Sequence, residues 1–239
     1  MELSILSESE DFISLNKPAG LIIHSDGRTE EPSVAEWLLE HCPFLAAVGE
    51  PWISPRGEKI ITAGLVHRLD RTTSGVVLAA KTREMYLYLK QQFKERKVEK
   101  RYLALVYGDM EKESGEIVAE IMRSSVPPKK WYSRPTTWGD RRAAITDWKV
   151  LERITDEKGN KASVLEIEPK TGRTHQIRVH FASIGHPLVA DHLYAPESPS
   201  LFGFHRPALH AVSVTFDLPS GKRAHFEAPL PLDFLNINF

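Results

Sequence analysis

The sequence predicts an α+β fold, with a mixed, mainly antiparallel sheet and helices packed against it. Strand-like segments outnumber helical ones, and the helices interrupt the strands without strict alternation. Two late pairs of strand-like segments are joined by short polar turns, as in antiparallel hairpins. The 239 residues suit one mixed domain or two small ones, and 41% hydrophobic residues can bury a core.

Strands are predicted where apolar and β-branched residues cluster. They cover 11–16, 75–81, 101–108, 144–153, 163–170, 208–216 and the return strand RAHFEAP. The run at 75–81 is apolar throughout, which is typical of a strand buried on both faces. Lys158, Gly159 and Asn160 form the predicted turn between two of these strands.

Two helices are predicted in the first hundred residues. Ser33 can cap the first, and Glu36 completes a capping box three residues later. Met85, Leu89 and Phe93 recur every four residues, so they share one face of the second helix.

A third helix is predicted over 174–185, with Thr174 as its N-cap and Gly185 just past its end. His175 and Arg178 are three residues apart, so they share a helix face. A cation there suits a phosphate or a carboxylate.

Positive charge is clustered although the net charge is only −1. Segment 90–101 has six basic residues. It is predicted to belong to a basic helix that presents Lys90, Lys94 and Lys97. Segment 123–142, taken as a loop, has six basic residues and one acidic residue, with tryptophan and tyrosine interleaved. Such segments suit a nucleic acid whose bases can stack, although a solvated surface explains the first equally well.

Several functional classes lack their signatures. Cys42 is the only cysteine, so neither an internal disulfide nor a cysteine-based zinc site is expected, and a reducing cytoplasm is favoured. The acidic N-terminus does not resemble a secretory signal, and no apolar run is long enough to cross a membrane. Glycine-rich nucleotide motifs, HExxH and GxSxG are all missing, so no cofactor and no metal are expected.

Asp70 stands among cations directly before a predicted buried strand, in HRLDRTTSG. Arg68 and Arg71 flank it, and a cation within about 4–6 Å keeps a carboxylate ionised. An oriented, ionised carboxylate can act as a nucleophile. It can equally cap a turn or pair with a surface arginine, and spacing alone leaves both interpretations open.

Five segments together resemble one family. They are NKPAGLIIH (16–24), HRLDRTTSG (67–75), KRYLALVYG (100–108), LEIEPKTGRTHQIRVHFASIGHPLVAD (165–191) and LHA (209–211). In this order they resemble the motifs of RluA-type pseudouridine synthases, over residues 5 to 230. The resemblance implies the pseudouridine synthase catalytic fold as a single domain over 1–239, without a preceding S4-type RNA-binding domain.

The resemblance also implies roles for individual residues. Asp70 matches the obligatory aspartate, which attacks C1′ of the ribose or C6 of the base. Arg178 matches the arginine that pairs with this aspartate, and Tyr102 the tyrosine that stacks on uracil and helps remove the C5 proton. Arg68 matches an arginine near the vacated base position, whereas Arg71 receives no firm role. The isomerisation is redox-neutral, so no cofactor is required.

The implied partner is RNA, a stem-loop of tRNA or of large-subunit ribosomal RNA, bound by a cytoplasmic monomer. The expected RNA-binding or substrate-binding residues are Arg68, Arg71, His175, Leu209, Lys129, Lys130 and Arg134. Two alternatives remain. One is a non-catalytic RNA-binding protein built on the same domain. The other is a metal-dependent nuclease, although the sequence lacks the carboxylate cluster that such an enzyme needs.

Overall fold

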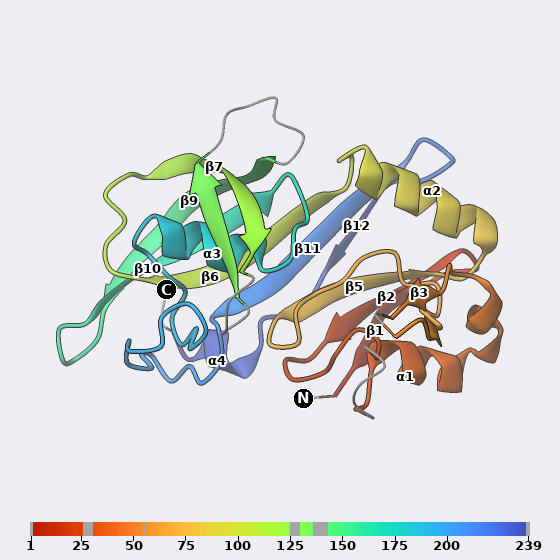
Figure 1. Cartoon of the computed structure of the whole chain (residues 1–239), viewed down its shortest axis with the longest axis horizontal. Coiled ribbons are helices and arrows are strands. Elements are labelled where there is room, and N and C mark those ends of the chain that lie inside the picture. The colour runs from red at the N-terminus through yellow and green to blue at the C-terminus, as the bar shows by residue number, and fades with distance from the viewer. Residues whose placement is uncertain (1, 26–30, 55, 125–129, 136–142, 238–239) are drawn as a thin grey trace. The chain divides into compact units, whose positions relative to one another are not determined.

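The computed structural model describes residues 2–25, 31–54, 56–124, 130–135 and 143–237. The chain divides into two compact units, coloured by residue number in Figure 1. Unit 1 comprises Met1–Glu99 and Ala211–Pro229, and unit 2 comprises Lys100–His210 and Leu230–Phe239.

Unit 1 is built on a mainly antiparallel sheet. Its strands are β1 (Ser4–Glu8), β2 (Phe12–Lys17), β5 (Ser74–Ala80), β11 (Leu209–Asp217) and β12 (Arg223–Glu227), with a small separate hairpin of β3 (Trp52–Ile53) and β4 (Lys59–Ile60). Its helices are α1 (Val34–His41), the 3-10 helix η1 (Pro43–Ala47) and α2 (Arg83–Lys94). The strand order is β1-β2-β5-β11, with β12 paired to β11. Every residue of β2 and β5 is buried. Strand β5 is mostly apolar, whereas β2 also buries Ser14, Asn16 and Lys17.

The two helices predicted in this unit are confirmed. Ser33 caps α1 and forms the predicted capping box with Glu36. On α2, Met85 and Leu89 are buried. The helix ends at Lys94, however, so the expectation that 90–101 belongs to one basic helix is wrong: Arg96 takes a left-handed backbone that stops it.

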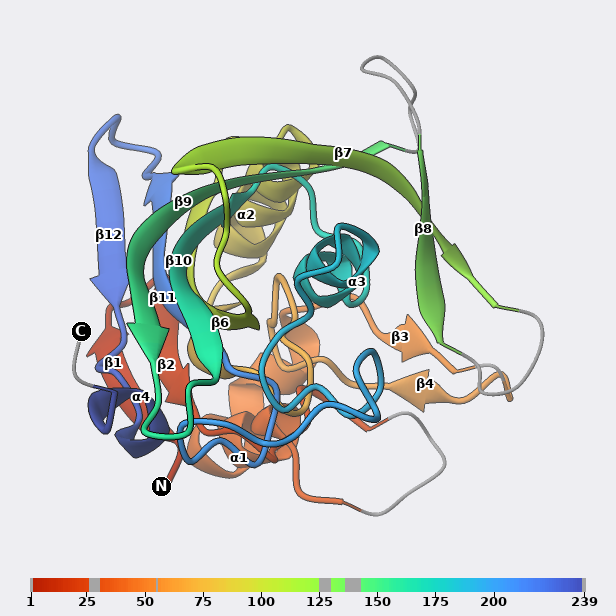
Figure 2. The same ribbon diagram turned by 90° about the vertical axis from the view of Figure 1, so that its left-hand side faces the viewer.

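Unit 2 is a strongly curved antiparallel sheet around a helix. Its elements are β6 (Glu99–Tyr107), β7 (Ser114–Arg123), β8 (Trp131–Pro135), β9 (Ala143–Thr155), β10 (Lys161–Pro169), α3 (Gln176–Ser183) and α4 (Leu232–Leu235). The strand order is β6-β10-β9-β7-β8, each pair antiparallel. Figure 2 shows the long strands arching over α3. Apolar side chains of sheet and helix, among them Ile167, Ile177 and Phe181, form one cluster.

The α+β class and most predicted strands are confirmed, including the hairpin that turns at Gly159 and the pair β11 and β12. Two predictions in unit 2 are wrong. Helix α3 begins at Gln176, and its N-cap is His175 in a left-handed conformation, not Thr174. Segment 123–142 is not simply a loop, because residues 131–135 form β8 against β7.

Candidate active site

Asp70 lies in a loop of unit 1 that runs directly into β5, as predicted. Its carbonyl accepts a hydrogen bond from the Thr73 amide at 3.1 Å, which forms a tight turn. Upstream, the Leu78 amide donates to Nε2 of His67 at 2.9 Å, and the buried Leu69 anchors the loop in the core. The half-buried Asp70 side chain therefore stands on a backbone that is fixed on both sides.

Lys17 anchors the same loop from beneath. This lysine is fully buried, and its Nζ donates to the carbonyls of Pro18 (2.9 Å), Leu21 (2.8 Å) and Arg71 (3.2 Å). Three carbonyl acceptors match the three N–H donors of an ammonium group. The NKPAG turn and the residue after Asp70 are thereby joined. Sequence reasoning did not single out Lys17, because a lysine in a strand is ordinarily exposed.

Arg71, which the sequence left without a firm role, holds the loop by its side chain and its backbone. Its Nε donates to the carbonyl of Gly20 at 3.1 Å, and the Gly20 amide donates back to the carbonyl of Arg71 at 2.8 Å. The guanidinium also pairs with Glu31. Both arginines beside Asp70 are exposed. Of the two, Arg71 has the hydrogen bonds that join this loop to the NKPAG turn.

Gly75 ends the HRLDRTTSG segment for a steric reason. A Cβ at this position would lie 2.1 Å from the carbonyl oxygen of Ala211, and its φ is +116°. Only glycine fits such an approach of two backbones. The first residues of β5 are therefore held against β11, and the loop that carries Asp70 starts from a rigid strand.

Tyr102 and Leu209 lie together in unit 2. Leu209 is part of the apolar cluster beneath α3, and Tyr102 packs against the same cluster. Lys100, two residues before Tyr102, is on the same face of β6 because strand residues alternate. Its Nζ approaches the Thr171 carbonyl at 3.4 Å, and burial, aided by nearby Lys170, lowers its pKa to about 8.

The loop before α3 is tied to the sheet by Gln176. Its Nε2 donates to the Ile145 carbonyl and to Oγ1 of Thr146, both at 2.9 Å, and its Oε1 accepts from Thr171 at 2.7 Å. Lys170 bridges Glu168 and Asp147 at 3.1 Å each.

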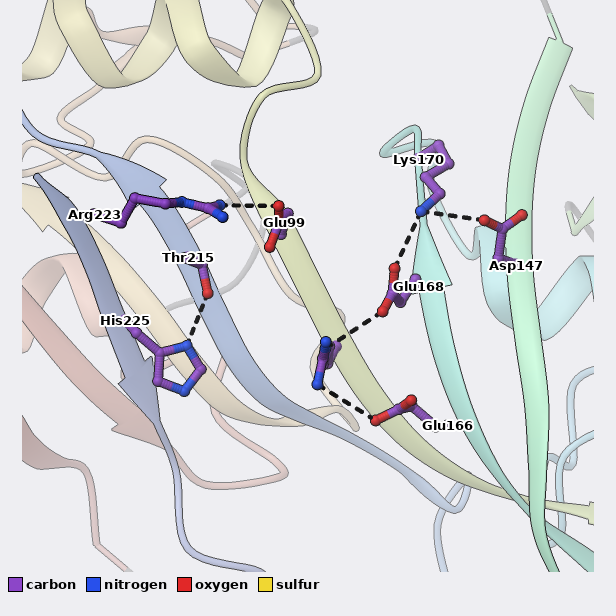
Figure 3. Close-up of polar contacts among 9 residues, drawn as sticks. Glu99, Asp147, Glu166, Glu168, Lys170, Thr215, Arg223 and His225 are labelled. Carbon is purple, nitrogen blue, oxygen red and sulfur yellow. Dashed lines mark hydrogen bonds and ion pairs between the residues drawn. The ribbon is translucent and has the colours of Figure 1, made fainter. Parts of the chain in front are cut away.

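Figure 3 shows this bridge. Arg101 forms ion pairs with Glu166 and Glu168. The loop between β10 and α3 is therefore fixed at its start by Lys170 and at its end by Gln176.

Arg178 extends from α3 into a cluster of its own unit. Its Nε and Nη2 donate to the two carboxylate oxygens of Asp191 at 2.7 and 2.8 Å. The Tyr194 ring covers the guanidinium at 5.1 Å, and the Tyr194 hydroxyl lies 2.8 Å from Nδ1 of His175. The structure thus brings His175 and Arg178 together, through two residues that sequence reasoning missed.

Asp191 ends the HPLVAD segment of the motif, which was the only signal for it. The predicted pairing of Arg178 with Asp70 would join residues of the two units and stays a prediction.

The expected RNA-binding residues have different surroundings. Lys129 lies outside the described residues, and Lys130 is half-buried immediately before β8. Arg134, on β8, is exposed and pairs at 2.7 Å with the buried Glu120 of β7. On α2, Lys90 and Lys94 are exposed.

The described residues contain neither a cluster of metal-ligating side chains nor a membrane-spanning helix. Within them, no group of three or more His, Cys, Asp or Glu residues is placed to hold a metal ion. Over the same part of the chain, no helix has the length and hydropathy needed to span a membrane.

Comparisons with known proteins point in one direction. The family model of RNA pseudouridylate synthase matches residues 11–183. An uncharacterized RNA pseudouridine synthase of Synechocystis is 39% identical over 235 residues, which cover 97% of this chain and 67% of that protein. The ribosomal large subunit pseudouridine synthase D of Nitrosomonas europaea is 37% identical over 97% of this chain and 63% of its own length.

Solved structures that resemble nearly the whole chain include a human protein. Human RNA pseudouridylate synthase domain containing 1 superposes with a TM-score of 0.72 at 28% sequence identity. The match covers 96% of this chain and 84% of the human one.

Proposed function

Because this chain belongs to the RNA pseudouridylate synthase family, we propose that it isomerises a uridine of structured RNA to pseudouridine. The observation that carries this proposal is the HRLDRTTSG segment, with Asp70 on a loop fixed by Lys17 and Arg71. The matching segments follow one another along nearly the whole chain.

Large-subunit ribosomal RNA is the substrate we favour. Relatives 34–37% identical to this chain are named ribosomal large subunit pseudouridine synthase D. A stem-loop of tRNA is the other substrate expected from the RluA-type motifs. The single cysteine, Cys42, suits the reducing cytoplasm in which both RNAs are made.

The two units would act as one catalytic domain, and we expect a monomer. The matched family segment contains residues of both units, so neither unit alone corresponds to the family model. The proposed catalytic residues are divided in the same way: Asp70 belongs to unit 1, and Tyr102 and Arg178 to unit 2.

In the proposed reaction the N1–C1′ bond of uridine breaks, the base turns, and a C5–C1′ bond forms. The C5 proton is lost and N1 gains a proton, so no electrons are exchanged with a cofactor. Asp70 is the nucleophile, at C1′ or at C6. Arg178 would keep the reacting carboxylate ionised, and Tyr102 would stack on uracil and assist removal of the C5 proton.

The target uridine has to leave its base stack before it can react. Flipping costs a few kcal/mol, which stacking and phosphate contacts offset. We assign the phosphate contacts to the exposed Lys90 and Lys94 and to the segment around Lys130 and Arg134. Arg68 would occupy the space that the base leaves.

Tritium release tests the reaction directly. Large-subunit ribosomal RNA and tRNA transcripts labelled with tritium at uracil C5 should lose label to water when the enzyme is added. Asp70→Asn should abolish release, by more than ~10³-fold, and still bind RNA. The control Asp11→Asn alters an exposed aspartate before β2 and should leave the rate unchanged.

If the unaltered protein binds RNA but releases no label from either transcript, a non-catalytic RNA-binding role replaces the proposal. Activity in Asp70→Asn would remove the nucleophile assignment alone. Release that stops in EDTA would favour metal-dependent chemistry.

A test of the RNA contacts has to replace Glu120 together with Arg134, because the two side chains form an ion pair. Arg134→Gln alone would leave a buried carboxylate without this cation, so Glu120→Gln is added to keep an amide pair. Replacing Lys129 and Lys130 by glutamine in that background should weaken RNA binding. Each lost phosphate contact should reduce the slope of log affinity against log salt by about 0.7–0.9. An unchanged slope would show that this segment does not contact phosphate.

A further inference from the structure

The carboxylate partner of Arg178 inside its own unit is Asp191, which is held in position by hydrogen bonds of its own. The carbonyl of Asp191 accepts hydrogen bonds from the amides of Tyr194 (3.1 Å) and Ala195 (2.7 Å). Its Oδ1 accepts a further one from the Leu193 amide at 3.2 Å. The turn after Asp191 therefore fixes this carboxylate independently of Arg178.

The two-point contact determines how the guanidinium is oriented. Asp191 takes Nε and Nη2, which lie on one edge of the planar group. A further anion would therefore meet Arg178 at Nη1 or at the outer N–H of Nη2. Because the plane is fixed by two bonds and covered by the Tyr194 ring, the direction of those N–H groups is fixed as well.

The pair is almost completely removed from solvent. The Arg178 side chain is 8% exposed and that of Asp191 is fully buried. A buried ion pair with well-packed surroundings usually adds little to stability compared with apolar residues of similar size. The stability of the fold therefore gives no strong reason for an ion pair at this place.

We propose that Asp191 is a positioning residue of the isomerisation, which acts by aiming the guanidinium of Arg178 at the reacting groups. This inference rests on the proposed function. The Arg178–Asp191 pair carries no net charge, so Arg178 would act through directed hydrogen bonds rather than as an uncompensated cation. Tyr194 would support the arrangement from the face of the guanidinium.

Tyr194 also connects the pair to two other segments of unit 2. Its hydroxyl contacts Nδ1 of His175, the N-cap of α3, and accepts a hydrogen bond from the Trp131 amide of β8 at 3.3 Å. Because β8 carries Arg134, a proposed RNA contact, the orientation of Arg178 is linked to a strand that we expect to meet the substrate.

A matched control exists in the same unit. Asp233 makes a bidentate pair with Arg206, at 2.7 and 3.0 Å, and lies outside the proposed catalytic groups. Asp191→Asn and Asp233→Asn therefore remove the same charge from the same type of contact. Asp191→Glu keeps the charge but displaces the carboxylate by one methylene.

The experiment measures kcat and KM for tritium release from large-subunit ribosomal RNA transcript, together with the unfolding midpoint of each variant. Asp191→Asn should lower kcat by about 10²-fold with KM changed by less than about threefold, because a misaimed group costs this much. Asp233→Asn should keep kcat. Asp191→Glu should lower kcat by about tenfold in folded protein.

A double variant separates the effect on the orientation of Arg178 from the effect on the stability of the fold. Arg178→Met with Asp191→Leu replaces the pair by apolar side chains and should restore the unfolding midpoint while kcat stays low. The proposal is overturned if this double variant is active, or if folded Asp191→Glu and Asp191→Asn keep the unaltered kcat. If Asp191→Asn does not fold, the other two variants decide. An inactive unaltered protein would instead remove the proposed function.

Discussion

Unit 2 contains two arginine–aspartate pairs that look alike and lie in different surroundings. In each, Nε lies 2.7 Å from one carboxylate oxygen and Nη2 reaches the other. In each, an aromatic ring covers the guanidinium, Tyr194 over Arg178 and Phe234 over Arg206.

The pairs differ in burial and in what they join. Asp191 is fully buried, whereas the side chain of Asp233 is 25% exposed at the start of α4. Arg206 also donates to the Leu209 carbonyl at 3.0 Å, so this pair ties helix α4 to Leu209 within unit 2. The two pairs therefore show that the geometry of an arginine–aspartate contact does not by itself reveal the role of the pair. The position of the pair in the fold is also needed.

The largest expected effect is on stability when one partner is removed. Asp191→Asn leaves a buried guanidinium without its carboxylate and should reduce the free energy of unfolding by about 3–5 kcal/mol. Asp233→Asn should cost about 1–3 kcal/mol, because water can reach the remaining group. Denaturant unfolding of both variants measures the difference. Equal losses would contradict the argument from burial.

These two pairs also show where prediction from sequence stops. The capping box of α1 and the buried strand β5 were predicted correctly, because their signals lie within a few consecutive residues. Asp191 was missed because it meets Arg178 across a helix end and a turn, thirteen positions away. A bidentate contact has no local pattern at such a separation.

Strand β8 and Lys17 were missed for related reasons. The segment that contains β8 is basic and aromatic, and it becomes a strand through pairing with β7. Lys17 is buried because three carbonyls converge on it, which only the folded turn provides. For the candidate site, the motif segments supplied the candidate residues, whereas the residues that hold them in place are seen only in the fold.

Lys17 extends the comparison to a buried cation held by carbonyl groups. Lys17→Met fills a similar volume but removes the donors to the Pro18, Leu21 and Arg71 carbonyls. We expect a loss of about 3 kcal/mol in the free energy of unfolding, since unsatisfied buried acceptors are costly. The rate of tritium release should also fall, because the loop of Asp70 loses its anchor. A stable variant with an unchanged rate would show that the NKPAG turn and the loop of Asp70 keep their conformation without Lys17.

His180, on the same helix as Arg178, is a buried basic side chain that, unlike Lys17, is not held by hydrogen bonds to the described residues. It is fully buried, neither ring nitrogen has a hydrogen-bond partner among the described residues, and burial lowers its pKa to about 4. The unfolded chain, with a histidine pKa near 6.5, binds this proton first as pH falls. Stability should therefore decline between pH 6.5 and 4, by about 2 kcal/mol at pH 5.

The measurement for His180 is a series of denaturant unfolding curves from pH 8 to pH 4.5. His180→Leu removes the titrating group and keeps an apolar side chain in the core, so its stability should depend less on pH than that of the unaltered protein. An equally steep decline in both would assign the acid sensitivity to other groups.

The smallest expected effect concerns the rings that cover the two guanidinium groups. Tyr194→Phe makes the first pair resemble the second, since the ring stays and only the hydroxyl is lost. The hydrogen bonds to His175 and to the Trp131 amide disappear, which should cost about 1 kcal/mol of stability. Because Asp191 still holds Arg178, kcat should change by less than about threefold, while KM rises as β8 loses its connection. A large fall in kcat would instead show that the Tyr194 hydroxyl, and not Asp191, determines how Arg178 is aimed.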